Sequence, residues 1–421
     1  MPLGLSFNQY GLYPCVSFWS PSLSRDLVIS QLVGLMTCYV PIRISSLGKS
    51  LTISMKQRAD RLLLRIYFAP YGRTDYVVYH LTGKRQIDYS LATRTMAFDI
   101  KKLDWSKEIF EVAGIDVNKM SKTVPTGTDA GVITAEAAEK TGLAPSTHIV
   151  SISHDQVSAA IGAGAFDSSV AVDGAGTVEC VTPIYDSIPD IEAMYDGYFS
   201  IVPYVIPGKY VAYAFSYTGG ALIQWCVDNL AKDEKRAAAD RDLSVNEYLE
   251  KKYATERGEE NPSNLLILPH FAGAATPYMD TGSKGAILGL TIDTTVADIY
   301  RGCMEGVVYE MLVNTSALKK SGCKFKKLNA TGGGARSGEW MQMKADMLNV
   351  PITALKTVDA GTVGSAMLTG IATGVFKDLN DAAEHMVEET VEYLPRKEMH
   401  EKYMHIFERY AKVYQAVRPL V

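Results

Sequence analysis

The chain has 421 residues, of which 47% are hydrophobic and 21% are charged, and its formal net charge is −5. This length is too great for one compact core and predicts two or three domains. Basic residues are scattered among acidic ones rather than clustered in a stripe, so we expect no nucleic-acid partner. The six cysteines form no CxxC pair and have no metal-ligand spacing, which favours a reduced cytoplasmic protein with buried free thiols.

Residues 1–60 differ in composition from the rest of the chain. They are rich in Ser, Leu, Tyr and Pro, their acidic residues are Asp26 and Asp60, and they show no clear helical or strand period. The mostly apolar run 27–42 is slightly short for a membrane span, and its leader is too long and uncharged for a secretion signal. We therefore expect no membrane segment and interpret residues 1–60 as an aberrant N-terminal segment.

A regular pattern of strands and helices begins at Arg61. It predicts a helix over 75–81, a turn at 82–83, a small-residue segment near 90–95, a helix that starts at Ser106, and a helix over 132–143 that ends at Gly142. Alternation of strands and helices is typical of the α/β class.

The segment 149–180 is the one around which the function is inferred. It opens with IVSIS, a short β-branched strand, and continues with His154, Asp155 and Gln156, where the strand gives way to a small-residue helix over 157–166. An α/β sheet presents catalytic side chains at such strand ends. The alternative, in which Asp155 only caps the helix, stays open.

The second part of this segment, SSVAVDGAGTVEC, predicts a hairpin with a Gly-rich tip. Backbone N–H groups exposed at such a tip can bind an anion, and phosphate is the natural ligand. An ordinary hairpin turn at 174–177 is the alternative.

The later chain continues the α/β pattern. We expect two aromatic strands within 198–215, a helix that starts at Gly219 and Gly220, a solvated helix pair within 233–262, a buried strand before the loop 269–280, and a long helix over 294–318. The N-terminus of the helix at Gly219 and Gly220 could receive a phosphate or the face of a base.

Two further Gly-rich turns follow. One is Gly332, Gly333 and Gly334, between a short strand and a helix that carries Trp340, and the other begins the small-residue stretch 359–374. Glycines between a strand and a helix let a planar ligand or a phosphate approach the backbone. Three such turns and a strand-end aspartate suggest a nucleotide beside an acid–base catalyst.

Together these motifs resemble the FGGY carbohydrate kinases, the group that contains glycerol kinase, xylulokinase and fuculokinase. The resemblance runs from about Asp75 to the C-terminus through HDQVSAAIGAG, GAGTVEC, TGGALIQW and TGGGARSGEWMQMKADML. It implies an α/β protein with the two-domain actin/Hsp70-like (ribonuclease H-like) ATPase fold. Residues 61–165 would form the remainder of the N-terminal, sugar-binding domain, and residues 166–421 the C-terminal, nucleotide-binding domain.

The resemblance also implies roles for individual residues. Asp155 matches the general base that takes the proton from the substrate hydroxyl, and His154 and Gln156 match substrate contacts. The nucleotide-binding positions are Gly176, Thr177, Gly219, Gly220, Gly333, Gly334, Ala335 and Ser337.

The implied reaction is the ATP-dependent phosphorylation of a sugar or polyol, most readily a ketose such as xylulose or fuculose. The implied cofactors are ATP and Mg²⁺, and a homodimer is left open. Glu305 and Asp346 are not assigned as metal ligands, because each lies in a predicted helix and a solvent-facing position is expected for it.

One departure from the family pattern lies at the start of the chain. Family members begin with a strand that carries Asp-x-Gly-Thr, and we find no such motif there, so we expect an incomplete first domain from a truncated or frame-shifted N-terminus. A degenerate homologue that binds nucleotide or sugar without turnover is therefore an alternative. An acetate-kinase-like or chaperone-like ATPase would explain the glycines but not HDQ or GEWMQMKAD.

Overall fold

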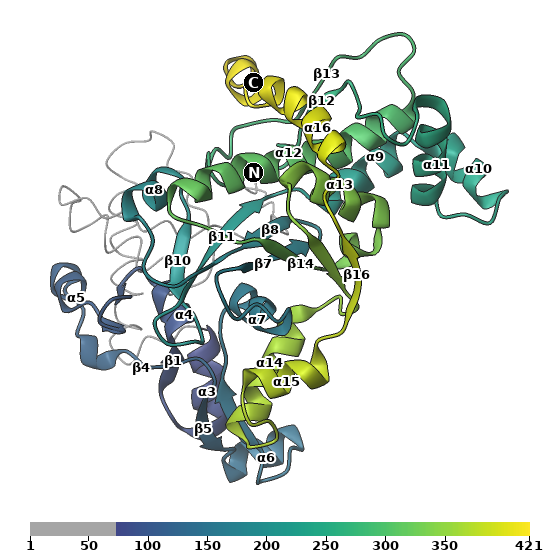
Figure 1. Ribbon diagram of the computed structural model, residues 1–421. Coiled ribbons are helices and arrows are strands. Elements are labelled where there is room, and N and C mark those ends of the chain that lie inside the picture. The colour runs from purple at the N-terminus through teal and green to yellow at the C-terminus, as the bar shows by residue number, and fades with distance from the viewer. Residues whose placement is uncertain (1–72) are drawn as a thin grey trace, which may run out of the picture. The chain divides into compact units, whose positions relative to one another are not determined.

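The structure is a computed structural model, and it describes residues 73–421 (Figure 1). The chain forms two compact units. The first contains the described residues through His154 together with Leu368–Val375, and the second contains Asp155–Met367 and Phe376–Val421. The expectations for residues 1–60, including the apolar run and the incomplete first domain, lie outside the described residues. Within 73–421, no helix combines the length and the apolar character needed to cross a membrane.

The first unit is built from short elements. Its helices are α3 (Arg73–Thr82), α4 (Tyr89–Thr93), α5 (Lys107–Ala113) and α6 (Ala135–Thr141), and its strands are β1 (Gln86–Asp88), β2 (Phe98–Asp99), β3 (Asp104–Trp105), β4 (Lys122–Val124), β5 (Thr128–Val132) and β6 (His148–Ser151). β1 pairs with β4 in parallel, and β5 pairs with β6 antiparallel. The local signals acted as expected, because Ser106 caps α5 and Gly142 ends α6 in the left-handed conformation.

The second unit is organised around one mixed sheet with the strand order β10-β11-β8-β7-β14-β15-β16, in which β9 also pairs with β11. The strands are β7 (Val170–Ala175), β8 (Glu179–Thr182), β9 (Ile184–Tyr185), β10 (Ser200–Pro203), β11 (Tyr210–Ser216), β14 (Lys327–Thr331), β15 (Ile352–Leu355) and β16 (Glu389–Tyr393). β7, β14 and β15 run parallel at its centre, and the remaining neighbours are antiparallel. The predicted hairpin of 168–180 is therefore confirmed as β7 and β8.

Helices cover both faces of this sheet (Figure 1). The helices from Asp155 onward are α7 (Asp155–Gly162), α8 (Ile191–Asp196), α9 (Gly220–Asn229), α10 (Lys232–Ala239), α11 (Val245–Arg257), α12 (Val296–Lys320), α13 (Gly338–Leu348), α14 (Ala360–Ala372), α15 (Leu379–Met386), α16 (Lys397–Tyr410) and α17 (Val413–Val417), and of these α7, α12 and α13 contact strands of the sheet. A separate hairpin consists of β12 (Leu266–Leu268) and β13 (Ala286–Leu288). α7 begins two residues earlier than expected, so Asp155 is the first residue of that helix.

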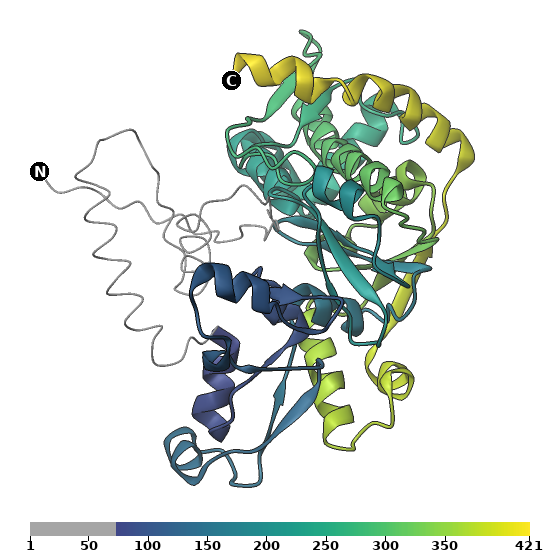
Figure 2. The ribbon, with the colours of Figure 1, turned by 90° about the vertical axis from the view of Figure 1, so that its left-hand side faces the viewer.

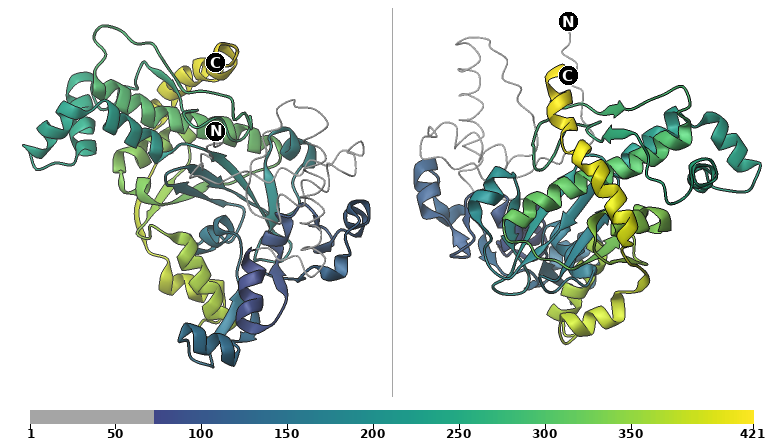
Figure 3. Two further views of the ribbon diagram at one scale, coloured as in Figure 1. Left: turned by 180° about the vertical axis from the view of Figure 1, so that it is seen from behind. Right: turned by 45° about the horizontal axis from the view of Figure 1, so that its top comes forward.

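The core of the second unit surrounds α12. This helix begins with a capping box formed by Thr295 and Asp298 and is buried along most of its length. Figure 3 shows it lying across the sheet, and Figure 2 shows the C-terminal helices α16 and α17 on the outside of the same layer. The four described cysteines, Cys180, Cys226, Cys303 and Cys323, are buried free thiols, as the sequence predicted.

Candidate nucleotide and catalytic site

Three loops of the second unit meet at one edge of its sheet. Because β7, β14 and β15 are parallel, their carboxyl ends lie at the same edge. The turn 176–178 follows β7, the segment 332–337 follows β14, and the loop 356–359 follows β15 and leads into α14. Thr331 Oγ1 donates a hydrogen bond to the Thr357 carbonyl oxygen at 2.9 Å, which joins the second loop to the third. Two Gly-rich turns and the loop 356–359, which are far apart in the sequence, are thus brought to one edge of the sheet.

The hairpin turn and the start of α9 are bonded directly to each other. The backbone N–H groups of Gly219 and Gly220 donate to the carbonyl oxygens of Thr177 and Gly176, both at 2.9 Å, and Ala221 N–H donates to Thr177 O at 3.1 Å. These N–H groups are the donors that a helix N-terminus offers to an anion. The turn therefore already occupies these donors, while the expectation that Gly219 and Gly220 lie beside the nucleotide, for example against the face of its base, stays a prediction.

Close packing explains the glycine at position 219. A Cβ atom there would lie 2.9 Å from Glu179 Oε2 and 2.9 Å from the Val178 carbonyl carbon. The helix start can approach the hairpin only without a side chain. Thr177, in contrast, is exposed at the tip of the turn, where a ligand can reach it.

The glycines of the second turn divide into two kinds. A Cβ at Gly334 would lie 2.7 Å from the Trp340 ring and 3.0 Å from Ala175 Cβ, so the protein itself requires glycine there. A Cβ at Gly333 would meet nothing within 4 Å, and its φ is not in the left-handed region. The space beside Gly333 is therefore open to a ligand.

Ser337 has a structural role within the second turn. Its Oγ accepts a hydrogen bond from Trp340 N at 3.2 Å and so caps α13. The same hydroxyl donates to Glu250 Oε1 at 3.2 Å. Burial raises the pKa of Glu250 to about 7, with the nearby carboxylate of Glu339 adding to the shift.

We predict that Gly333→Leu and Gly334→Leu separate ligand binding from folding. Gly333→Leu should leave the thermal unfolding temperature nearly unchanged but weaken MgATP binding about tenfold or more, because the side chain fills the open space. Gly334→Leu should lower the free energy of unfolding by about 1–3 kcal/mol through overpacking against Trp340. Calorimetric titration and thermal unfolding measure the two effects. Unchanged MgATP affinity in Gly333→Leu would remove Gly333 from the nucleotide site.

Asp155 lies beside the third loop. A Cβ at Gly162 would lie 1.9 Å from the Ala360 carbonyl oxygen, and one at Gly364 would lie 1.9 Å from the Ser158 carbonyl oxygen, so α7 and the start of α14 are in backbone contact. A Cβ at Gly361 would lie 3.6 Å from the Asp155 carbonyl oxygen. The small residues of both helices allow this approach, as the sequence suggested. Asp155 is exposed, and its Oδ1 accepts a hydrogen bond from Gln156 N at 2.7 Å.

His154 belongs to the first unit, where α4 holds it. Its backbone N–H donates to Ser90 Oγ at 2.9 Å, and its Nε2 lies 2.9 Å from Arg94 Nη1. Since a guanidinium can only donate, Nε2 is the acceptor in this contact. Ser90 in turn donates to the buried Asp88, whose pKa is raised by burial against the opposing hydrogen bond from Thr126.

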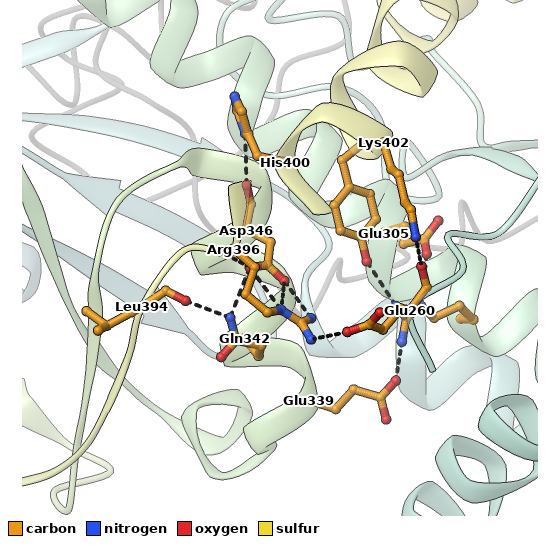
Figure 4. Close-up of polar contacts among 11 residues, drawn as sticks. Glu260, Glu305, Glu339, Gln342, Asp346, Leu394, Arg396, His400 and Lys402 are labelled. Atoms are coloured by element: carbon orange, nitrogen blue, oxygen red, sulfur yellow. Dashed lines mark hydrogen bonds and ion pairs between the residues drawn. The ribbon is translucent and has the colours of Figure 1, made fainter. Parts of the chain in front are cut away.

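Glu305 and Asp346 are both buried, and each forms an ion pair of its own (Figure 4). The expected solvent-facing position was therefore wrong for both. Asp346 Oδ2 accepts from Arg396 Nη2 at 2.8 Å. Glu305 Oε1 accepts from Arg301 Nε at 2.9 Å and from Ser263 N at 3.0 Å. Periodicity could not show this, because α12 and α13 are buried on more than one side. The protein itself supplies hydrogen-bond donors to the carboxylates of Glu305 and Asp346.

Sequence reasoning missed a buried charged cluster at the base of the hairpin turn. Lys344 of α13 is 0% exposed and contacts Asp173 of β7 and Glu179 of β8. The sequence signal is a lysine within the mostly apolar run WMQMKADML, together with one acidic residue on each side of the turn.

The sheet with helices on both faces, the second compact unit and the loops at one edge define the two-domain actin/Hsp70-like fold. Residues 65–162 match the N-terminal domain, and residues 176–373 the C-terminal domain, of the FGGY family of carbohydrate kinases. The chain belongs to this family.

Its relatives are named for different substrates. The chain is 26% identical over 344 residues to a xylulose kinase from Staphylococcus epidermidis, which covers 82% of the chain and 65% of the relative. It is 29% identical over 328 residues to a glycerol kinase from Alkaliphilus oremlandii, which covers 76% and 61%. A ligand-bound xylulose kinase structure from Lactobacillus acidophilus superposes with a TM-score of 0.72 at 24% identity, covering 82% of this chain and 67% of that one. The chain thus spans less than two thirds of the length of these curated relatives.

Proposed function

We propose that this protein transfers the γ-phosphoryl group of ATP to a hydroxyl group of a sugar or polyol. The observation that carries the proposal is that the exposed Asp155 begins α7, the helix in backbone contact with the start of α14, and that α14 follows one of the three loops at the edge of the sheet. Membership of the FGGY family supports the same reaction class. A homologue that binds nucleotide or sugar without turnover would not need Asp155 in this position.

Phosphoryl transfer requires mainly alignment and charge stabilisation from the protein. Asp155 accepts the proton of the substrate hydroxyl as the hydroxyl oxygen bonds to the γ-phosphorus and the bond from that phosphorus to ADP breaks, and Gln156 and His154 orient the substrate. Gly176 and Thr177 hold the phosphates, and the open backbone at Gly333 with Ala335 and Ser337 holds the base and ribose. The residues present fit a nucleotide, which supplies the phosphoryl group together with Mg²⁺ to offset its charge.

The substrate class we propose is a ketose such as xylulose or fuculose. The names of the relatives support a neutral sugar or polyol. We further propose that the protein acts in the cytoplasm, because its described cysteines are free thiols.

A panel assay of the full chain tests this function. Purified protein is incubated with MgATP and each of xylulose, fuculose, ribulose and glycerol, and ADP release is followed in a coupled assay, with calorimetric titration of MgATP in parallel. We expect ADP release that depends on one ketose of the panel. Binding of MgATP without ADP release for any substrate would contradict the proposal and identify a degenerate homologue.

A further inference from the structure

The buried charged cluster of Lys344, Asp173 and Glu179 joins α13 to both strands of the hairpin. Lys344 Nζ donates to Asp173 Oδ2 at 2.7 Å and to Glu179 Oε1, and it lies 4.5 Å from the centre of the Trp340 ring. Asp173 is 0% and Glu179 is 1% exposed. Asp173 lies on β7 shortly before the turn 176–178, and Glu179, which pairs with Ala175 across the hairpin, directly follows the turn on β8. The two carboxylates therefore lie on opposite sides of the turn.

Stability alone is a poor explanation for such a cluster. Buried ion pairs contribute little beyond what apolar residues of similar volume would provide, because desolvation offsets the attraction. The rest of the inner face of α13, with Met343 and Met347, is apolar and packs in the core. A charged residue at position 344 therefore calls for another role.

The cluster touches the elements that carry the candidate nucleotide residues. α13 begins directly after the segment 332–337, and Glu179 directly follows the turn 176–178. Glu179 also packs closely against the start of α9, because its Oε2 would lie only 2.9 Å from a Cβ atom placed at position 219. A shift of either carboxylate would therefore move the turn relative to both helices.

We propose that Lys344 is a positioning residue which, through Asp173 and Glu179, fixes the turn 176–178 so that it can receive the phosphates of a nucleoside triphosphate. The choice of a nucleoside triphosphate as the ligand rests on the proposed function, whereas the role of Lys344 in fixing the turn does not depend on it.

The charge of the cluster affects an anion bound to the turn. Two carboxylates and one ammonium carry a net charge of −1 when all are ionised and are neutral when one carboxyl group is protonated. Burial, and then the charge of Asp173, raise the pKa of Glu179 well above its ordinary value, while Lys344 opposes the shift. Burial disfavours the charge on Lys344, but the two carboxylates outweigh it and raise its pKa. The proton therefore sits on Glu179 at low pH, and its loss as the pH rises should weaken phosphate binding.

Hydrogen exchange tests the positioning without any nucleotide. In Lys344→Met, the amides of Gly219, Gly220 and Ala221, which bond to the turn, should exchange about tenfold faster or more. The matched control is Lys140→Met, which removes an exposed ion pair with Glu136 and should change nothing at these amides. Equal acceleration in the core helix α12, or none at 219–221, would overturn the positioning role.

A second variant guards against failure of Lys344→Met to fold. Glu179→Gln keeps the size of the side chain but cannot ionise. At the alkaline end of the pH range, where Glu179 has lost its proton and is a charged acceptor for the Lys344 ammonium, exchange at 219–221 should therefore be severalfold faster in this variant than in the wild type. Equal exchange in a folded Glu179→Gln protein at that pH would likewise contradict the proposal.

The pH dependence of nucleotide affinity tests the charge. The dissociation constants of MgATP and MgADP are measured from pH 6 to pH 9 on the full chain. Affinity should fall with rising pH in the wild type and become flat in Glu179→Gln. Glu250→Gln, which removes a carboxyl group near Ser337 whose pKa is also raised, should keep the slope. A slope that persists in Glu179→Gln and vanishes in Glu250→Gln would contradict the inference. A wild type that binds neither nucleotide would instead contradict the proposed function and leave the exchange test to decide the positioning.

Discussion

Asp155→Asn is expected to lower kcat by about 10²-fold or more, the low end for loss of a general base. Asn keeps the size and the hydrogen-bonding capacity of Asp at this position but cannot accept the substrate proton. The affinity for MgATP, measured by calorimetry, should change little, because the carboxylate acts on the hydroxyl substrate. Steady-state ADP release with the preferred sugar measures kcat.

The helix-cap alternative predicts the opposite result. Asn and Asp are similar residues at a helix start, so a purely structural Asp155 would tolerate the change in both activity and stability. The matched control is Asp190→Asn at the start of α8, where Asp190 Oδ1 accepts from Ala193 N at 3.0 Å. That variant should remain active. Full activity in Asp155→Asn would refute the catalytic assignment.

Arg301→Met is expected to lower the free energy of unfolding by about 3–5 kcal/mol, because it leaves a buried carboxylate without its cation. Arg301 is 4% exposed and Glu305 is 0% exposed. Arg301 also donates to the Tyr403 hydroxyl at 2.9 Å and to Glu339, so one substitution removes several contacts of α12 with α13 and α16. Denaturant unfolding of the full chain measures the loss.

Two companion variants sharpen this test. Arg236→Met removes an exposed cation that pairs with the equally exposed Asp233, and its effect should stay within about 0.5 kcal/mol. Adding Glu305→Gln to Arg301→Met removes the unpaired charge and should recover part of the lost stability. A loss below about 1 kcal/mol in Arg301→Met would show that the buried pair is not required.

The sequence by itself determined the features that depend on residues close together in the chain. Ser106 caps α5, Gly142 ends α6, and the Gly-rich tip of the segment 168–180 forms the turn between β7 and β8. Each depends on a backbone conformation or a hydrogen bond within a few residues, which a local pattern can specify. The α/β class follows in the same way from alternating periods, and the motif spacing identified the family.

Only the tertiary structure decided which polar groups are free to act. The start of α9 carries the pattern of an anion site, yet its N–H groups bond to the turn 176–178, more than 40 residues earlier. Glu305 and Asp346 follow helical spacing as surface residues would, yet α12 and α13 are buried on several sides and arginines neutralise both carboxylates. Lys344 meets Asp173 across 171 positions of sequence. A charged side chain is buried only where a partner of opposite charge is available. The position of that partner is fixed by the packing of distant elements rather than by neighbouring residues.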